Sequence, residues 1–105
     1  MGVLIALSTV PDDVAAERIA RALVDEKLAA CVNRIPNVTS TFRWNGAVTS
    51  EREVLLVIKT TTERFAALRD RLVALHPYEL PELIAVDVAA GLERYLEWIG
   101  AETRG

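Results

Sequence analysis

Apolar and polar positions along the chain follow two different periods, one typical of strands and the other of helices. Residues Val3 to Thr9 form a nearly continuous apolar run, as expected of a strand buried on both faces. Pro11-Asp12-Asp13 is a signal for a helix start. Apolar residues then recur three and four positions apart to about Lys27. This stretch therefore predicts a buried strand followed by an amphipathic helix.

The middle of the chain predicts a long β-hairpin. An extended region runs from Ala29 to Trp44 and bends at Pro36-Asn37, where the proline indicates a bulge or an edge position. Asn45-Gly46 is a strong signal for a type I′ turn. The return strand covers about Ala47 to Thr60, and its charged part, Glu51-Arg52-Glu53, is expected to be solvated or to form ion pairs between subunits. The tip of such a hairpin should project.

The remaining segments predict a helix, a strand and a short second helix. Thr60-Thr61-Thr62-Glu63 supplies N-cap candidates for a helix whose apolar residues repeat from Phe65 to Leu75. Residues 83–88 predict a strand, and residues from Leu92 onward predict the short helix. The complete order predicts an α+β fold, a ferredoxin-like βαββαβ sandwich with a long hairpin between its second and third strands and an added C-terminal helix.

An uncovered sheet face is a consequence of this fold. Both main helices cover the same face, yet the first and third strands are apolar on both sides. A large exposed apolar patch usually marks an interface. Phe42 and Trp44 lie near the hairpin tip, far from the helices, and also indicate an interface. We therefore expect a homo-oligomer, since a closed ring would cover both the apolar face and the open strand edges.

Composition narrows the class of protein. The 105 residues fit a single domain, spanning residues 1–105. The net charge of -3, with scattered lysines and arginines, gives no footprint for nucleic acid. The first apolar run is too short to span a bilayer and follows no basic leader, so no membrane contact is expected. A single cysteine cannot form an internal disulfide, which favours a reducing, cytoplasmic location.

Residues 76–82 are the first place to look for chemistry. This stiff polar connector between a helix and a strand contains His76, the only histidine, and two of the four prolines. A histidine in the position of His76 more often ends a helix than binds a ligand. A cysteine in the position of Cys31 is more often a small buried hydrophobic residue than a reactive thiol. The chain has no Ser-His-Asp order, phosphate loop or paired metal-ligand motif, so we expect a non-enzymatic protein without catalytic residues.

Short sequence words spread over nearly the whole chain resemble those of a known family in their order and spacing. The words are Thr9-Val10-Pro11-Asp12, Leu28 to Asn33, Thr39 to Gly46, Lys59-Thr60-Thr61, the HPYELPE run 76–82, Gly91, and Tyr95 to Trp98. They are similar to the CutA family of divalent-cation tolerance proteins. The resemblance implies a ferredoxin-like homotrimer related in architecture to PII signalling proteins. It also implies a link to copper and divalent-cation tolerance, with copper binding as a reported activity.

The metal ligands implied by the resemblance are only partly present. Some family members place a cysteine at the position of Ser8 and a second histidine at that of Leu75, and neither residue here is a good ligand for copper. The remaining candidates for copper or another divalent cation are His76, Glu79 and Glu82. Two functions stay open: a trimeric non-enzymatic protein of cation tolerance or small-molecule sensing, or a direct copper-binding protein that uses His76 with carboxylates.

The predicted subunit interface carries four aromatic residues. These are Phe42, Trp44, Tyr78 and Trp98, of which Tyr78 is expected to line a groove between subunits. A divalent metal ion or a small-molecule ligand is expected at that interface, and the chain itself is the expected partner. No other cofactor is indicated.

Overall fold

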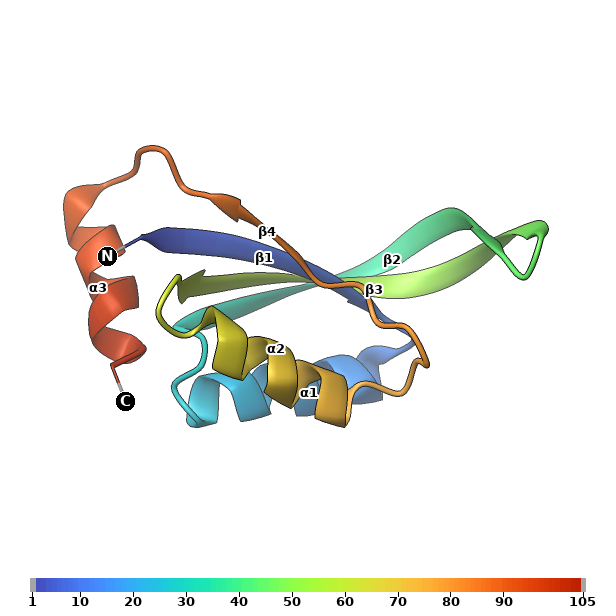
Figure 1. The fold of residues 1–105 in the computed structure, drawn as a ribbon, viewed down its shortest axis with the longest axis horizontal. Helices are drawn as coiled ribbons and strands as arrows, with labels where there is room; N and C mark the ends of the chain where they lie inside the picture. The colour runs from blue at the N-terminus through green and yellow to red at the C-terminus, as the bar shows by residue number, and fades with distance from the viewer. Residues whose placement is uncertain (1, 105) are drawn as a thin grey trace.

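The computed structural model describes residues 2–104 and confirms the predicted order of elements (Figure 1). Within these residues a four-stranded sheet is accompanied by three helices. In chain order the elements are β1 (Val3–Val10), α1 (Asp13–Asp25), β2 (Cys31–Trp44), β3 (Ala47–Thr61), α2 (Phe65–Leu75), β4 (Ile84–Asp87) and α3 (Glu93–Glu102).

The sheet has the topology of a ferredoxin-like sandwich. Its strand order is β2-β3-β1-β4, and every neighbouring pair is antiparallel. Helices α1 and α2 lie side by side against one face of the sheet (Figure 1). The predicted α+β fold is therefore confirmed, with β2 and β4 as its two edge strands.

The main core lies between the sheet and this helix pair. Most of its buried side chains come from alternate positions of β1 and β3 and from one face of each helix: Ala6, Val10, Val54, Leu56, Ile58, Ala15, Ala16, Ile19, Leu23, Leu68 and Leu72. Leu28 and Ala29, between α1 and β2, complete it. Helix α1 begins where the sequence predicts, because the Asp12 carboxylate accepts a hydrogen bond from the Ala15 amide at 2.9 Å.

The predicted N-cap of α2 is wrong. Strand β3 continues to Thr61, and α2 begins only at Phe65, after Arg64, which makes no side-chain capping bond. The Thr60 hydroxyl donates instead to the Leu28 carbonyl at 2.7 Å and is fully buried. A threonine fits a strand as well as a cap, and here the long pairing of β3 with β1 determines its conformation.

The predicted hairpin is confirmed, including its bend and its turn. The pairing of β2 with β3 shifts between Ile35 and Val38, and Asn37 in that interval has a φ of 62°. Asn45 and Gly46 have φ values of 52° and 78°, as a type I′ turn requires. Beyond this irregularity the hairpin extends past the helices and forms one end of the molecule (Figure 1).

The face of the sheet opposite α1 and α2 is apolar and largely uncovered. Residues paired across an antiparallel ladder share a face, so Leu7 lies beside Val57 and Ile84. Ile84 and Val86 are 57% and 56% exposed. We call this surface the open face; its apolar residues are Ile5, Leu7, Ile35, Leu55, Val57, Ile84 and Val86.

Helix α3 packs at the end of the sheet away from the hairpin tip (Figure 1). Ile99 of α3 is buried with Val3 and Ala30, forming a second, smaller core. On its outer side Trp98 is 42% exposed and stacks on Tyr95, with ring centroids 5.5 Å apart. Among residues 2–104, no helix has the length and apolar character needed to cross a membrane.

Candidate functional site

A groove lies where the connector between α2 and β4 meets the hairpin. It has a volume of about 550 Å³. Aromatic side chains of the hairpin and residues of the proline-bound connector both line it. We call it the connector groove; its lining residues are Pro11, Phe42, Trp44, Glu51, Arg52, Pro77, Tyr78, Glu79 and Leu80.

His76 fixes the start of the connector through both nitrogens of its ring. It caps the C-terminus of α2, as its position in the sequence favoured, and is 8% exposed. Its Nε2 lies 2.8 Å from the Thr9 carbonyl oxygen, and the Tyr78 amide lies 3.1 Å from its Nδ1. A carbonyl only accepts and an amide N–H only donates, so this geometry requires a neutral imidazole that is protonated at Nε2.

A metal ion would therefore compete with hydrogen bonds that the ring already makes. Coordination at Nδ1 would displace the Tyr78 amide, and coordination at Nε2 would displace the Thr9 carbonyl. Glu79 and Glu82 are both exposed. Within residues 2–104, no three His, Cys, Asp or Glu side chains are placed to hold one metal ion. The structure thus does not bring the three candidate ligands together.

Tyr78 connects the same segment to the hairpin. Its hydroxyl donates to Glu53 Oε2 at 2.7 Å, and its ring lies 4.8 Å from that of His76. Burial raises the pKa of Tyr78 well above its ordinary value. The hydrogen bond to Glu53 and the negative charges of Glu53, Glu51 and Asp12 raise it further. The phenol therefore stays protonated and serves as a hydrogen-bond donor.

Of the two alternatives for Glu51-Arg52-Glu53, solvation is wrong at Glu53, and ion pairing between subunits stays a prediction. This carboxylate is only 5% exposed. It lies two residues before Leu55 on the same strand, and so on the open face. This two-residue spacing from Leu55 was the signal in the sequence for the burial of Glu53. The charged residues around it indicated exposure instead.

The four predicted interface aromatics do not form one group. Phe42, Trp44 and Tyr78 all line the connector groove, so the structure brings these three together. Trp98 lies instead on α3, at the end of the sheet away from the hairpin tip (Figure 1). Tyr78 lies 34 positions after Trp44 and 20 before Trp98, and the sequence carries no signal for which of these it shares a surface with.

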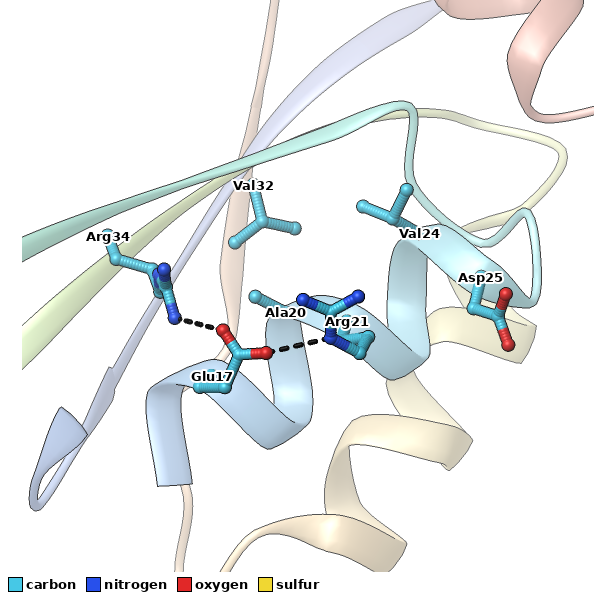
Figure 2. A pocket seen from close by; sticks show the side chains of 7 residues that line it. All are labelled: Glu17, Ala20, Arg21, Val24, Asp25, Val32 and Arg34. Atoms are coloured by element: carbon cyan, nitrogen blue, oxygen red, sulfur yellow. Dashed lines mark hydrogen bonds and ion pairs between the residues drawn. The ribbon is translucent and has the colours of Figure 1, made fainter. Parts of the chain in front are cut away.

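A second groove, between α1 and the edge strand β2, was not predicted. Figure 2 shows Glu17 between two arginines: Arg21 Nε donates to it at 2.7 Å and Arg34 at 2.6 Å. The hydrogen bonds from Arg21 and then Arg34 lower the pKa of Glu17. The groove has a volume of about 310 Å³. Its central charges are thus already paired with one another, and only the four-residue spacing of Glu17 and Arg21 was visible in the sequence.

The environment of Cys31 differs from the expected buried apolar site. Its thiol is half-buried on the same face of the sheet as Lys59, whose Nζ lies 4.0 Å from Sγ. The ammonium group also donates to the Asn33 side chain. Cys31 therefore borders a polar spot on the open face, formed by Lys59 and Asn33.

The comparisons with known proteins identify the family. The family model described as CutA1 divalent ion tolerance protein matches residues 4–102. The chain belongs to this CutA1 family. The divalent-cation tolerance protein CutA of Thermus thermophilus is 48% identical over 99 residues, covering 94% of this chain and 96% of that protein. A solved structure of the divalent cation tolerance protein from Thermus thermophilus superimposes with a TM-score of 0.95 at 47% identity, covering 97% of this chain and 99% of the other.

A CutA relative from a plant shows how length and location vary within the family. The chloroplastic CutA protein of Arabidopsis thaliana is 43% identical over 96 residues, covering 91% of this chain. This chain spans 53% of that protein's length. Because one relative is named for the chloroplast, membership of the family does not by itself assign a compartment.

The two longest CutA-like words both contribute side chains to the lining of the connector groove. Residues 39–46 supply Phe42 and Trp44, and residues 76–82 supply Pro77, Tyr78, Glu79 and Leu80. The segments that most resemble the family therefore meet in space, although about thirty positions separate them in the sequence. The connector groove is accordingly the candidate functional site.

Proposed function

We propose that this CutA1-family chain is a non-enzymatic homotrimer that acts in the cellular response to divalent metal ions such as copper, and that it senses a small ligand in the manner of PII proteins. The observation that carries the proposal is the open face. Its exposed isoleucine and valine side chains form an apolar surface of the kind that stable assemblies bury.

Self-association would cover two features that a single chain leaves exposed, the open face and the two edge strands. Burial of apolar surface contributes about 25 cal/mol per Å², and the open face offers such surface on all four strands. Edge strands β2 and β4 could pair with neighbouring copies in a closed ring. The number three comes from the family resemblance, and a closed three-fold ring is compatible with both features.

Sensing rather than catalysis is supported by the chemistry of the connector groove. Its lining combines aromatic rings, prolines and unlike charges, which are suited to holding a ligand. His76, the most versatile acid-base group of the chain, uses both ring nitrogens for hydrogen bonds that hold the connector. We place this activity in the cytoplasm, where the single cysteine would remain reduced.

Complementation tests the role in metal tolerance. A host that lacks its own copy of the gene is grown in graded concentrations of Cu(II), with the wild-type chain or with Ile84→Glu, which places a charge on the open face. We expect the wild type to restore growth and the variant to fail. Equal growth with and without the wild-type gene would contradict the role in tolerance.

Direct copper binding through His76 is the second candidate, favoured by the position of the only imidazole three residues before Glu79 in the connector. Calorimetric titration of Cu(II) into wild type and His76→Gln separates the two candidates. Because both ring nitrogens are engaged, we expect equal and weak binding. A wild-type site that is at least tenfold tighter than that of the variant would establish His76 as a ligand and favour the second candidate.

A further inference from the structure

We propose that the connector groove binds a small organic cation of the alkylammonium class, with aromatic rings around the cation and carboxylates at its rim. The inference rests on the ligand-sensing part of the proposed function, for which it names the class of ligand. Three properties of the groove support it: its size, its aromatic rings and its charges.

The size of the groove fits an organic molecule rather than a bare ion. A volume of about 550 Å³ falls within the range of small-ligand sites. A divalent metal ion requires several oxygen, nitrogen or sulfur ligands at short distance. In the part of the chain that the structure describes, no three acidic, histidine or cysteine side chains converge in this way. The groove is therefore poorly built for a metal ion.

Three aromatic side chains line the groove. Phe42 and Trp44 come from the hairpin and Tyr78 comes from the connector. The face of an aromatic ring carries negative charge density and attracts cations, including quaternary ammonium groups. Trp44 is 42% exposed, so its ring is accessible to a ligand. Tyr78 is held in place by its hydrogen bonds at both the hydroxyl and the backbone amide.

The charges around the groove favour a cation. Glu51 and Glu79 line it together with a single cation, Arg52. None of these three forms an ion pair with another residue between positions 2 and 104. The Tyr78 hydroxyl experiences the negative charges of Glu53, Glu51 and Asp12, which contribute to its raised pKa. Negative charge thus exceeds positive charge, and it adjoins the aromatic rings.

Titration with choline, at constant ionic strength set with sodium chloride, tests the proposal. Binding is followed by amide chemical shifts of residues 42, 44, 78 and 79 in the assembled wild-type protein. Choline is compared with 3,3-dimethyl-1-butanol, a neutral molecule of the same shape. We expect saturable shifts with choline and binding of the neutral molecule weaker by about fivefold to thirtyfold, the range between an exposed and a desolvated cation–π contact.

Trp44→Leu and Trp98→Leu are matched variants, because both tryptophans are 42% exposed and only Trp44 lines the groove. We expect Trp44→Leu to weaken choline binding at least fivefold and Trp98→Leu to leave it unchanged. Glu79→Gln should weaken binding, whereas Arg52→Gln should strengthen it. Opposite signs from two exposed charge-removing changes are not expected from a general loss of stability.

Three results would overturn the inference: no saturable shift in the wild type, equal binding of the neutral molecule, or equal weakening by both tryptophan variants. Occupation of the groove by a neighbouring copy of the chain would give the first of these. The mass of the assembly is measured on the same sample. A failure of self-association would thus appear in the mass, and a failure of the ligand inference would appear in the shifts.

Discussion

The side chains of His76 and Tyr78 join the connector to two different strands. His76 bonds to Thr9 at the end of β1, and Tyr78 bonds to Glu53 of β3. Hydrogen bonds that involve a charged partner contribute about 1.5–3 kcal/mol, and loss of one partner leaves the other buried and unpaired. These two residues therefore hold the connector, which supplies part of the lining of the groove.

Tyr78→Phe should destabilise the fold by about 1–3 kcal/mol, because Glu53 loses its hydrogen-bond donor while it remains buried. Urea unfolding near pH 8 measures the change. Tyr95→Phe is the control, since the Tyr95 hydroxyl makes no hydrogen bond within residues 2–104 and its ring lies at the surface. A loss of stability in Tyr95→Phe equal to that in Tyr78→Phe would contradict this account.

The same contact gives the stability a dependence on alkaline pH. The pKa of Tyr78 is raised in the folded state, so the folded chain keeps a proton that the unfolded chain releases near pH 10. The stabilisation is complete below that pH and is lost as the pH rises above it. The difference in unfolding free energy between wild type and Tyr78→Phe should therefore stay constant up to about pH 10 and shrink as the pH rises further. A constant difference would show that the phenol is not perturbed by folding.

Replacement of Ser8 by alanine should stabilise the folded protein. Its hydroxyl is fully buried among the core residues of β1 and has no hydrogen-bond partner in residues 2–104. A buried, unpaired hydroxyl costs about 1–3 kcal/mol, so we expect Ser8→Ala to raise the melting temperature by a few degrees. Thermal unfolding checks this. A clear decrease would indicate that the hydroxyl has a partner in the native protein.

The two main helices begin for different physical reasons. Helix α1 has a local start signal, the Asp12 cap, and an apolar face that the periodicity predicts. Helix α2 has no side-chain cap, and its start depends on where β3 stops pairing with β1. A local signal is readable in the sequence. A boundary that depends on pairing with β1, far earlier in the chain, cannot be read from the local sequence. The threonines before α2 were therefore predicted as caps although they belong to β3 or to the turn after it.

Asp12→Ala should shorten or fray the first turn of α1 at a cost of about 1 kcal/mol. The carboxylate accepts a hydrogen bond from the Ala15 amide, and its charge lies at the positive end of the helix dipole. Chemical denaturation gives the loss, and Asp12→Asn, which keeps the accepting oxygen, should recover most of it. If Asp12→Asn is as unstable as Asp12→Ala, the cap is not the cause.

At the scale of the whole molecule, the sequence predicts the fold better than the site. The order of elements, the bend near Asn37 and the Asn45-Gly46 turn follow from local pattern and composition. The pairing of Tyr78 with Glu53, and the separation of Trp98 from the other aromatics, depend on how distant segments meet. Local sequence patterns do not predict such long-range contacts, so the connector groove could be identified only from the structure.

The open face and the projecting hairpin together give the molecule an unusual shape for an isolated chain. Its extents are 44 × 25 × 22 Å, with the helices α1 and α2 covering only one side of the sheet. Isolated apolar residues at a surface are ordinary, but a contiguous apolar sheet face is typical of a contact between subunits. Assembly through this face is the central claim, because the proposed trimer depends on it.

Sedimentation equilibrium at micromolar protein tests that claim most directly. Ile84→Glu adds a charge to the open face, and Val73→Glu is a matched change at an exposed valine of α2, on the covered side of the sheet. We predict that wild type and Val73→Glu sediment with three times the chain mass of 11.6 kDa, and that Ile84→Glu dissociates while keeping its folded circular dichroism spectrum. A wild-type protein that sediments with the mass of a single chain would contradict the account.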